Sequence, residues 1–178
     1  MGSYEIIREQ YRPQHIRFLL IAESPPPAPH IQSSRQFYYT DRIRTDDRLF
    51  TNTIKALYPA AAGQTEAQLQ AAKAEWLTRF KNDGWYMIEA LEASQPHSVT
   101  TKQRQARIAE GLPILLRRVK SLAASDTKII LIKSNVFEVA AEPLRKAGYG
   151  VLNTKLLDYP GHFNQRAYRE KLAALAQL

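Results

Sequence analysis

Charged and polar side chains follow four apolar segments of this chain, in positions from which they could share one catalytic site. Glu23 and Glu89 each end such a segment, and the turn at residues 133–135 and the loop at 158–162 follow the other two. Two carboxylates, a lysine and a histidine suit a hydrolytic or glycosidic reaction. In such a reaction a carboxylate positions water and a cation stabilises the departing anion.

The four apolar segments that must position these side chains have the composition of buried strands. Five of the six residues at 16–21 are apolar without alternation, which is typical of a strand buried on both faces of a parallel sheet. Strands alternating with helical patterns predict an α/β fold, a three-layer α/β/α sandwich with a four-stranded parallel sheet. Because the carboxyl ends of parallel strands share one edge, their polar residues would line one crevice. The predicted strands are 16–21, 85–88, 128–132 and 150–153.

Helical periodicity and end signals predict the segments between the strands. Thr65 and Gln68 form a capping-box pattern, and Gly84 is placed to end the helix that follows. Thr100 or Thr101 opens a long basic helix, which Pro113 should kink or divide. The other predicted helices cover 4–11, the stretch from the capping cluster 45–47 to Pro59, 136–146, and a last helix from about Asn164.

Length and composition predict one soluble domain over residues 1–178. A chain of 178 residues with 44% hydrophobic content can bury one sizeable core. It has no apolar run near the length of a membrane span and no secretory leader, so a cytoplasmic protein without membrane contact is expected. The absence of cysteine excludes disulfides, thiolate metal sites, iron–sulfur clusters and cysteine nucleophiles.

The net charge favours a polyanionic partner. Lys and Arg total 25 against 17 Asp and Glu, a formal charge of +8. Such a surface attracts nucleic acid at long range, although many basic proteins are only kept soluble by their charge. The chain has no P-loop, no G-x-G-x-x-G and no G-x-S-x-G motif. It therefore lacks the sequence markers of nucleoside-triphosphate-binding proteins, dinucleotide-binding proteins and α/β-hydrolases.

Several candidate residues have both a functional and a structural interpretation. Glu23 precedes a proline-rich stretch that holds the chain extended, and it is either a presented catalytic group or a surface residue before a turn or polyproline ligand. Paired carboxylates could also bind Mg²⁺, although no third acidic ligand is obvious. His162 precedes a helix and could be catalytic or only cap the helix and fill space.

Three adjacent aromatic residues stand in the loop after the first strand. Phe37, Tyr38 and Tyr39 offer flat faces on which a base could stack, and the loop arginines could hold phosphate. Equally, Phe37 and Tyr39 could anchor the loop in the core. The arginines concerned are Arg35, Arg42 and Arg44.

Two short motifs resemble those of the uracil-DNA glycosylase superfamily. Ala22-Glu23-Ser24-Pro25-Pro26 after a buried strand is similar to its G-E-A-P-G type first motif. Tyr159-Pro160-Gly161-His162 stands where that superfamily carries its H-P-S type second motif, followed by a helix as here. The order of elements agrees over nearly the whole chain, whereas the motif matches are short.

The resemblance implies a domain that flips a base out of DNA and hydrolyses its glycosidic bond without a cofactor. By position, Glu23 matches the water-orienting acid, Phe37 or Tyr38 lies in the loop that supplies the stacking ring, and Pro160 with Gly161 would contact the phosphate backbone. His162 is expected as a second catalytic residue and Glu89 as a base contact. The remaining residues expected to bind phosphate or DNA are Ser24, Pro25, Lys133, Ser134, Tyr159 and Arg166.

The departures from the motifs are also informative. Glu89 stands where an asparagine would read the uracil edge, and a carboxylate repels the carbonyl oxygens of uracil unless it is protonated. Tyr159 replaces the second-motif histidine, and His162 lies three positions later. We therefore expect a divergent member that acts on another base, a nucleic-acid-binding module without turnover, or a hydrolase of small nucleoside-type substrates. The sequence predicts no oligomeric state.

Overall fold

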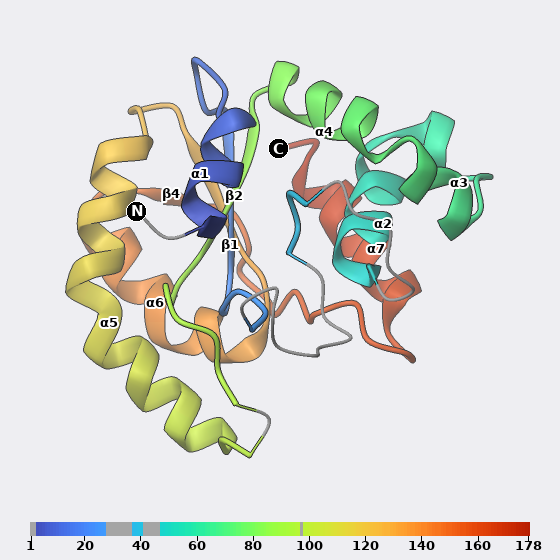
Figure 1. The fold of residues 1–178 in the computed structure, drawn as a ribbon. Helices are drawn as coiled ribbons and strands as arrows, with labels where there is room; N and C mark the ends of the chain where they lie inside the picture. Colours follow the sequence, from blue (N-terminus) through green and yellow to red (C-terminus); the bar gives the residue numbers. More distant parts are fainter. Residues whose placement is uncertain (1–2, 28–36, 41–46, 97) are drawn as a thin grey trace.

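The computed structural model describes residues 3–27, 37–40, 47–96 and 98–178, and in this part of the chain it contains a four-stranded parallel sheet (Figure 1). The strand order is β2-β1-β3-β4, so β1 lies in the interior of the sheet with parallel neighbours on both sides. This confirms the predicted α/β fold with four parallel strands. The strands are β1 (Phe18–Ala22), β2 (Trp85–Glu89), β3 (Lys128–Leu131) and β4 (Gly150–Val151).

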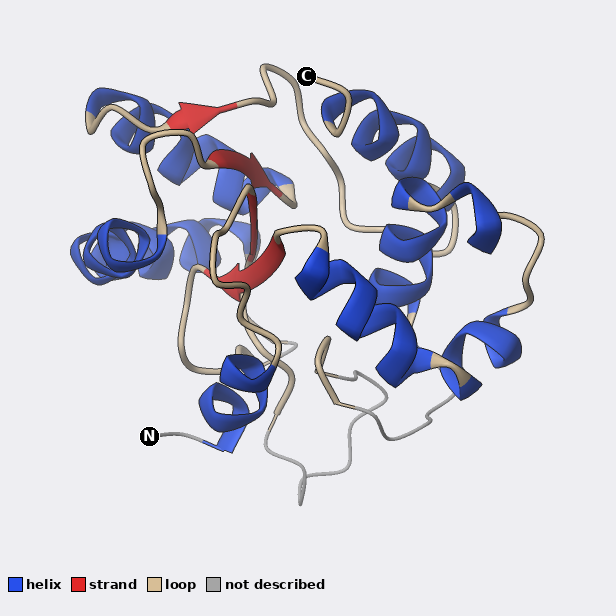
Figure 2. Ribbon diagram, turned by 90° about the horizontal axis from the view of Figure 1, so that it is seen from above, coloured by secondary structure: helices blue, strands red, loops and turns tan. Residues whose placement is uncertain are grey.

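Helices cover both faces of the sheet and complete the α/β/α layers. Figure 2 shows α5 and α6 on one side of the strands and α2, α4 and α7 on the other. None of the described helices combines the length and the apolar character needed to cross a lipid bilayer. The helical segments are α1 (Ser3–Gln10), α2 (Arg48–Leu57), η1 (Pro59–Ala61), α3 (Glu66–Ala71), α4 (Lys73–Asn82), α5 (Thr101–Leu122), α6 (Ser134–Lys146) and α7 (Gln165–Leu175).

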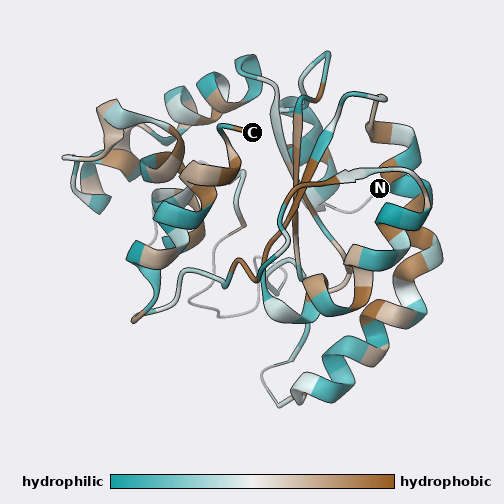
Figure 3. Ribbon diagram, turned by 180° about the vertical axis from the view of Figure 1, so that it is seen from behind, coloured by the Kyte–Doolittle hydropathy of each residue, from teal (hydrophilic) through white to brown (hydrophobic). Residues whose placement is uncertain are grey.

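The sheet forms the centre of the hydrophobic core. Leu19, Leu20 and Ile21 of β1 are fully buried, as expected for an interior strand with helices on both faces. Figure 3 shows apolar residues gathered along the strands, while the helices carry both hydrophilic and hydrophobic residues. The apolar runs seen in the sequence are therefore explained by burial on both faces.

The register of the strands determines which polar residues meet at the carboxyl edge. Ala22 pairs with Glu89 of β2, and Ile21 pairs with Leu131 of β3. Glu23, one residue past β1, therefore lies level with the segment that follows β3. On the other side, the pairing of β1 with β2 continues past the strand ends, because the N–H of Leu91 donates to the carbonyl of Glu23 at 3.0 Å.

The predicted helix ends are mostly confirmed. Thr65 and Thr100 each form a complete capping box with the glutamine three residues later. Gly84 has a φ of 80°, which a side chain would disfavour, and it ends the helical segment as predicted. α5 continues through Pro113 from Thr101 to Leu122, so the proline does not divide it.

One helical prediction was wrong, and another is borne out only in part. The single helix expected after Thr65 is two helices that meet at Ala72. Asp47 stands at the N-cap position of α2 but makes no side-chain capping bond. Its carboxylate instead accepts a hydrogen bond from Lys73 of α4 at 2.6 Å, and both side chains are buried. The rest of the predicted capping cluster, residues 45–46, lies outside the described residues.

The fourth strand is shorter than predicted because a side chain continues its pairing. β4 covers only Gly150–Val151. Two residues later, the side-chain oxygen of Asn153 accepts from the N–H of Leu131, and its amide nitrogen donates to the carbonyl of Leu131, both at 3.0 Å. The carboxamide thus reproduces the two hydrogen bonds that a longer strand would have made.

Candidate active site

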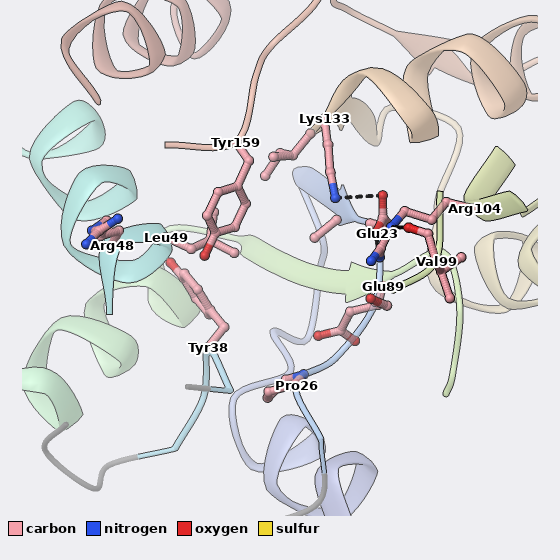
Figure 4. Close-up of a pocket in the computed structure, with 13 residues that line it drawn as sticks. Glu23, Pro26, Tyr38, Arg48, Leu49, Glu89, Val99, Arg104, Lys133 and Tyr159 are labelled. Carbon is pink, nitrogen blue, oxygen red and sulfur yellow. Dashed lines mark hydrogen bonds and ion pairs between the residues drawn. The ribbon is translucent and has the colours of Figure 1, made fainter. Parts of the chain in front are cut away.

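A cavity of about 410 Å³ opens at the carboxyl edge of the sheet (Figure 4). Its walls come from the ends of β1, β2 and β3, from the first turns of α2 and α5, and from the loops that carry Tyr38 and Tyr159. Parallel α/β sheets bind ligands at this edge. The lining residues are Ala22, Glu23, Ser24, Pro26, Tyr38, Arg48, Leu49, Glu89, Val99, Arg104, Ile132, Lys133 and Tyr159.

Glu23 lies in the wall of this cavity and is surrounded by hydrogen-bond donors. Its Oε1 accepts from Arg104 Nη1 at 2.8 Å. Its Oε2 accepts from Asn135 Nδ2 at 2.7 Å and lies 2.8 Å from Lys133 Nζ. An ionised carboxylate offers about four acceptor positions, so these three contacts leave about one, on Oε1.

The surroundings of Glu23 favour its ionised form. Burial alone would raise the pKa of this carboxyl, but the hydrogen bonds from Lys133 and Asn135, the charge of Lys133 and the bond from Arg104 lower it below its ordinary value of 4.5. At neutral pH the cavity therefore contains a carboxylate. Such a group can accept a hydrogen bond from water and orient it.

Lys133 is held in a backbone conformation that side chains rarely adopt. It connects β3 to α6 with φ 81° and ψ 141°, and it is the one non-glycine residue with positive φ in the described part of the chain. Its N–H donates to the carbonyl of Leu157 at 2.7 Å. Strain of this kind costs about 1–3 kcal/mol and is concentrated at functional sites. Here it aims the lysine at Glu23.

Arg104 is fixed by the loop that precedes α5. Its Nε donates to the carbonyl of Val99 at 3.1 Å, and Nη2 donates to the carbonyl of Pro96 at 2.8 Å. The third group, Nη1, is the one that reaches Glu23. Sequence reasoning missed this residue, because the capping box at Thr100 predicts where α5 begins but not that its first turn overhangs the sheet edge.

Glu89 contributes a second buried carboxylate to the same cavity. It forms an ion pair with Arg8 of α1, and Arg118 of α5 donates to its main-chain carbonyl at 2.9 Å. Burial raises the pKa of Glu89, and the charges of Arg8 and Arg118 act against this rise. Figure 4 shows the acidic side chains of Glu23 and Glu89, which both line the cavity.

The opposite wall carries two tyrosines and an arginine. Tyr38 is 3% exposed, and burial raises the pKa of its hydroxyl well above the usual range, so the group is neutral. Its Oη has no hydrogen-bond partner in the described part of the chain. Figure 4 shows Tyr38, Tyr159 and Arg48 across the cavity from Glu23. A buried hydroxyl without a partner beside a cavity is a candidate ligand contact.

The aromatic loop divides between the cavity and the core. Tyr38 lines the cavity, but Phe37 is 2% exposed, stacks on Tyr4 and does not line the cavity. Tyr39 is also buried, and its hydroxyl accepts from the N–H of Met87 at 2.6 Å. Phe37 and Tyr39 therefore anchor the loop, the structural alternative considered above. The loop arginines 35, 42 and 44 lie outside the described residues.

The structure brings some of the predicted residues to the cavity and leaves others away from it. Glu23, Ser24, Tyr38, Glu89, Lys133 and Tyr159 line it. Pro25, Ser134, Pro160 and Gly161 are near in sequence but are not lining residues.

The two other predicted residues lie on the surface. His162 is exposed, and its ring contacts that of Phe163. Arg166 is exposed and pairs with Glu170 one turn along α7 at 2.7 Å. Neither lines the cavity. Phe163, which sequence reasoning missed, is fully exposed on the loop that carries Tyr159.

In the described segments, no group of three or more histidine or acidic side chains is arranged to hold a metal ion. The chain matches no protein-family model, no curated protein and no solved structure. The chemistry of the site therefore has to be inferred from its own residues. These are an ionised carboxylate with one acceptor position left, two cations in contact with it, a second carboxylate and a buried hydroxyl.

Proposed function

We propose that this protein is a divergent relative of the uracil-DNA glycosylases that binds nucleic acid, receives a flipped base in the cavity and hydrolyses its N-glycosidic bond. The observation that carries the proposal is the Glu23 carboxylate, ionised and with an acceptor position left, in a cavity of about 410 Å³. Cavities of roughly 300–1,000 Å³ hold small ligands, so this one has room for a base with its sugar.

Each site residue has a defined part in the proposed reaction. A water molecule donates a hydrogen bond to Glu23 and attacks the anomeric carbon of the sugar. The bond from that carbon to the base nitrogen breaks, and its electron pair leaves with the base. Lys133 and Arg104 supply positive charge in the cavity wall, which stabilises the negative charge that develops on the departing base. The water proton passes to solvent, and the base anion takes up a proton.

The loop before α7 supports binding to nucleic acid. Tyr159 lines the cavity, and Phe163 on the same loop is fully exposed. Exposed apolar side chains beside a base pocket can enter a base stack and fill the gap that a flipped nucleotide leaves. The formal charge of +8 is suited to the phosphate backbone.

The test is release of a base from oligonucleotides. Single- and double-stranded substrates carrying uracil, hypoxanthine, guanine and other bases are incubated with the wild type, Glu23→Gln and Glu23→Ala. We expect both variants to lose about 10²–10⁴-fold in rate, the range for a positioned general base. Glu92→Gln, an exposed carboxylate just past β2, is the matched control and should keep the wild-type rate. Absence of release from every substrate, or an equal rate in Glu23→Ala, would rule out the catalytic proposal.

One observation favours a second candidate, a nucleic-acid-binding module without turnover. Three donors already occupy Glu23, as they would if its role were to fasten α5 and α6 to the sheet edge. This candidate predicts oligonucleotide binding that weakens steeply with salt and survives Glu23→Ala, because phosphate contacts dominate such affinity. Fluorescence anisotropy at several salt concentrations measures this binding, and the base-release assay separates the two candidates, because only the first predicts release.

A further inference from the structure

Glu89 is a buried acceptor beside the proposed catalytic carboxylate, and the reaction described above does not use it. Its side chain is 6% exposed and lines the cavity. Its register partner is Ala22, the residue before Glu23, and both glutamates line the same cavity. A buried charged group at such a place determines which ligand atoms can lie against it, because an unpaired charge is costly to bury.

The position of Glu89 is fixed from outside the cavity. Arg8 contacts Oε2 from α1, and Arg118 binds the main-chain carbonyl of the same residue. Besides Arg8, only the residue's own main chain hydrogen-bonds to this carboxylate in the described part of the protein. About two of its four acceptor positions therefore remain for a ligand.

We infer that Glu89 selects a base with two adjacent N–H donors, the pattern that guanine presents with N1–H and its 2-amino group. An ionised carboxylate accepts hydrogen bonds and cannot donate them. Two parallel donors match its two oxygens, as in other bidentate pairs. Uracil presents one N–H between two carbonyl oxygens, which the carboxylate repels. The inference rests on the proposed function, because it names the base that the cavity would receive.

The other polar groups of the cavity fit the same base. Guanine carries a carbonyl oxygen beside N1–H, and this acceptor needs a donor. The lining residues provide Lys133, Arg104 and the buried hydroxyl of Tyr38, whose Oη lacks a partner among the described residues. A purine ring with its sugar is also within the size that a cavity of about 410 Å³ admits.

The decisive comparison is between guanosine and inosine, which differ only in the 2-amino group. Binding of each to the full chain is measured by isothermal titration calorimetry. Guanosine should bind about 10–100-fold more tightly, the effect of one hydrogen bond to a charged group. In Glu89→Gln this preference should fall to about twofold or less, while Glu142→Gln, at an exposed carboxylate of α6, should keep it. Thermal melts of both variants establish that they are folded.

Equal affinities for the two nucleosides, or binding of neither, would overturn the inference, and the wild-type data suffice for this. The result is independent of the catalytic proposal. Guanosine preference without base release would leave the specificity of Glu89 standing and reject hydrolysis. Release of uracil from an oligonucleotide without a preference for guanosine would support hydrolysis and reject the specificity of Glu89.

Discussion

Arg104 Nη1 lies 2.8 Å from Oε1 of Glu23, and 81 residues of chain separate the two. The contact joins the first turn of α5 to the end of β1 in the wall of the cavity. Because Arg104 also binds the carbonyls of Pro96 and Val99, it fastens the loop before α5 to the same point. The hydrogen bonds of Arg104 therefore both position Glu23 and hold the loop that forms the adjacent wall of the cavity.

These contacts predict how stability depends on pH. The pKa of Glu23 is lowered in the folded state, so its ion pairs stabilise the fold above about pH 4.5, and this contribution is lost as the pH falls through the folded-state pKa. Glu23→Gln should be less stable than the wild type by about 3 kcal/mol at pH 7. The difference should shrink at pH 3. Urea unfolding at both values measures it, and a difference that does not change with pH would contradict the prediction.

The sequence predicted the frame of the site better than its contacts. The apolar run before Glu23 is typical of a strand covered on both faces, and its short length favoured a strand, so the sheet and its carboxyl edge followed from composition. Arg8 and Arg104 were missed, because helical periodicity gives the length of a helix and not the sheet edge over which its end projects. Phe37 and Tyr38 are neighbours of the same type, and only tertiary packing decides which enters the core.

Strain at Lys133 predicts an unusual order of stability between two variants. Lys133→Ala and Lys133→Gly both remove the ion pair with Glu23, but only glycine adopts φ 81° without cost. Lys133→Gly should therefore be more stable than Lys133→Ala by about 1 kcal/mol. Urea unfolding of the two proteins measures this difference. The reverse order, which is usual elsewhere in folded proteins, would show that the conformation is not strained.

Both Lys133 variants should also lose base release to a similar extent, because they lack the same ammonium group beside Glu23. The loss should be about 10²–10³-fold, as expected for removal of one group that stabilises developing negative charge. Lys146→Ala, which removes an exposed lysine of α6, is the control and should retain the wild-type rate. A Lys133→Gly protein with full activity would exclude the lysine from the reaction.

The buried pair of Lys73 and Asp47 should be important for stability and not for the reaction. Both side chains are 2% exposed, and Nζ lies 2.6 Å from the carboxylate. Lys73→Met leaves a buried carboxylate without this partner and should destabilise the fold by about 3–5 kcal/mol. Lys146→Met, in the exposed pair with Glu142, should have little effect. Thermal and urea unfolding compare the two variants. Equal losses of stability would mean that burial does not determine how much an ion pair contributes to the free energy of unfolding.

The exposed ring of Phe163 should affect duplex substrates alone. The side chain is fully exposed and packs against little of the fold, so Phe163→Ala should change the free energy of unfolding by less than about 0.5 kcal/mol. A duplex must be unstacked before a base leaves it, whereas a single strand need not be. Base release from a duplex should therefore fall about tenfold, with release from the matching single strand unchanged. The control is Ile114→Ala, which removes an exposed apolar side chain from α5, and it should leave both rates unaltered. Equal losses on the two substrates would assign Phe163 to general binding, and no loss on either would show that it does not enter the stack.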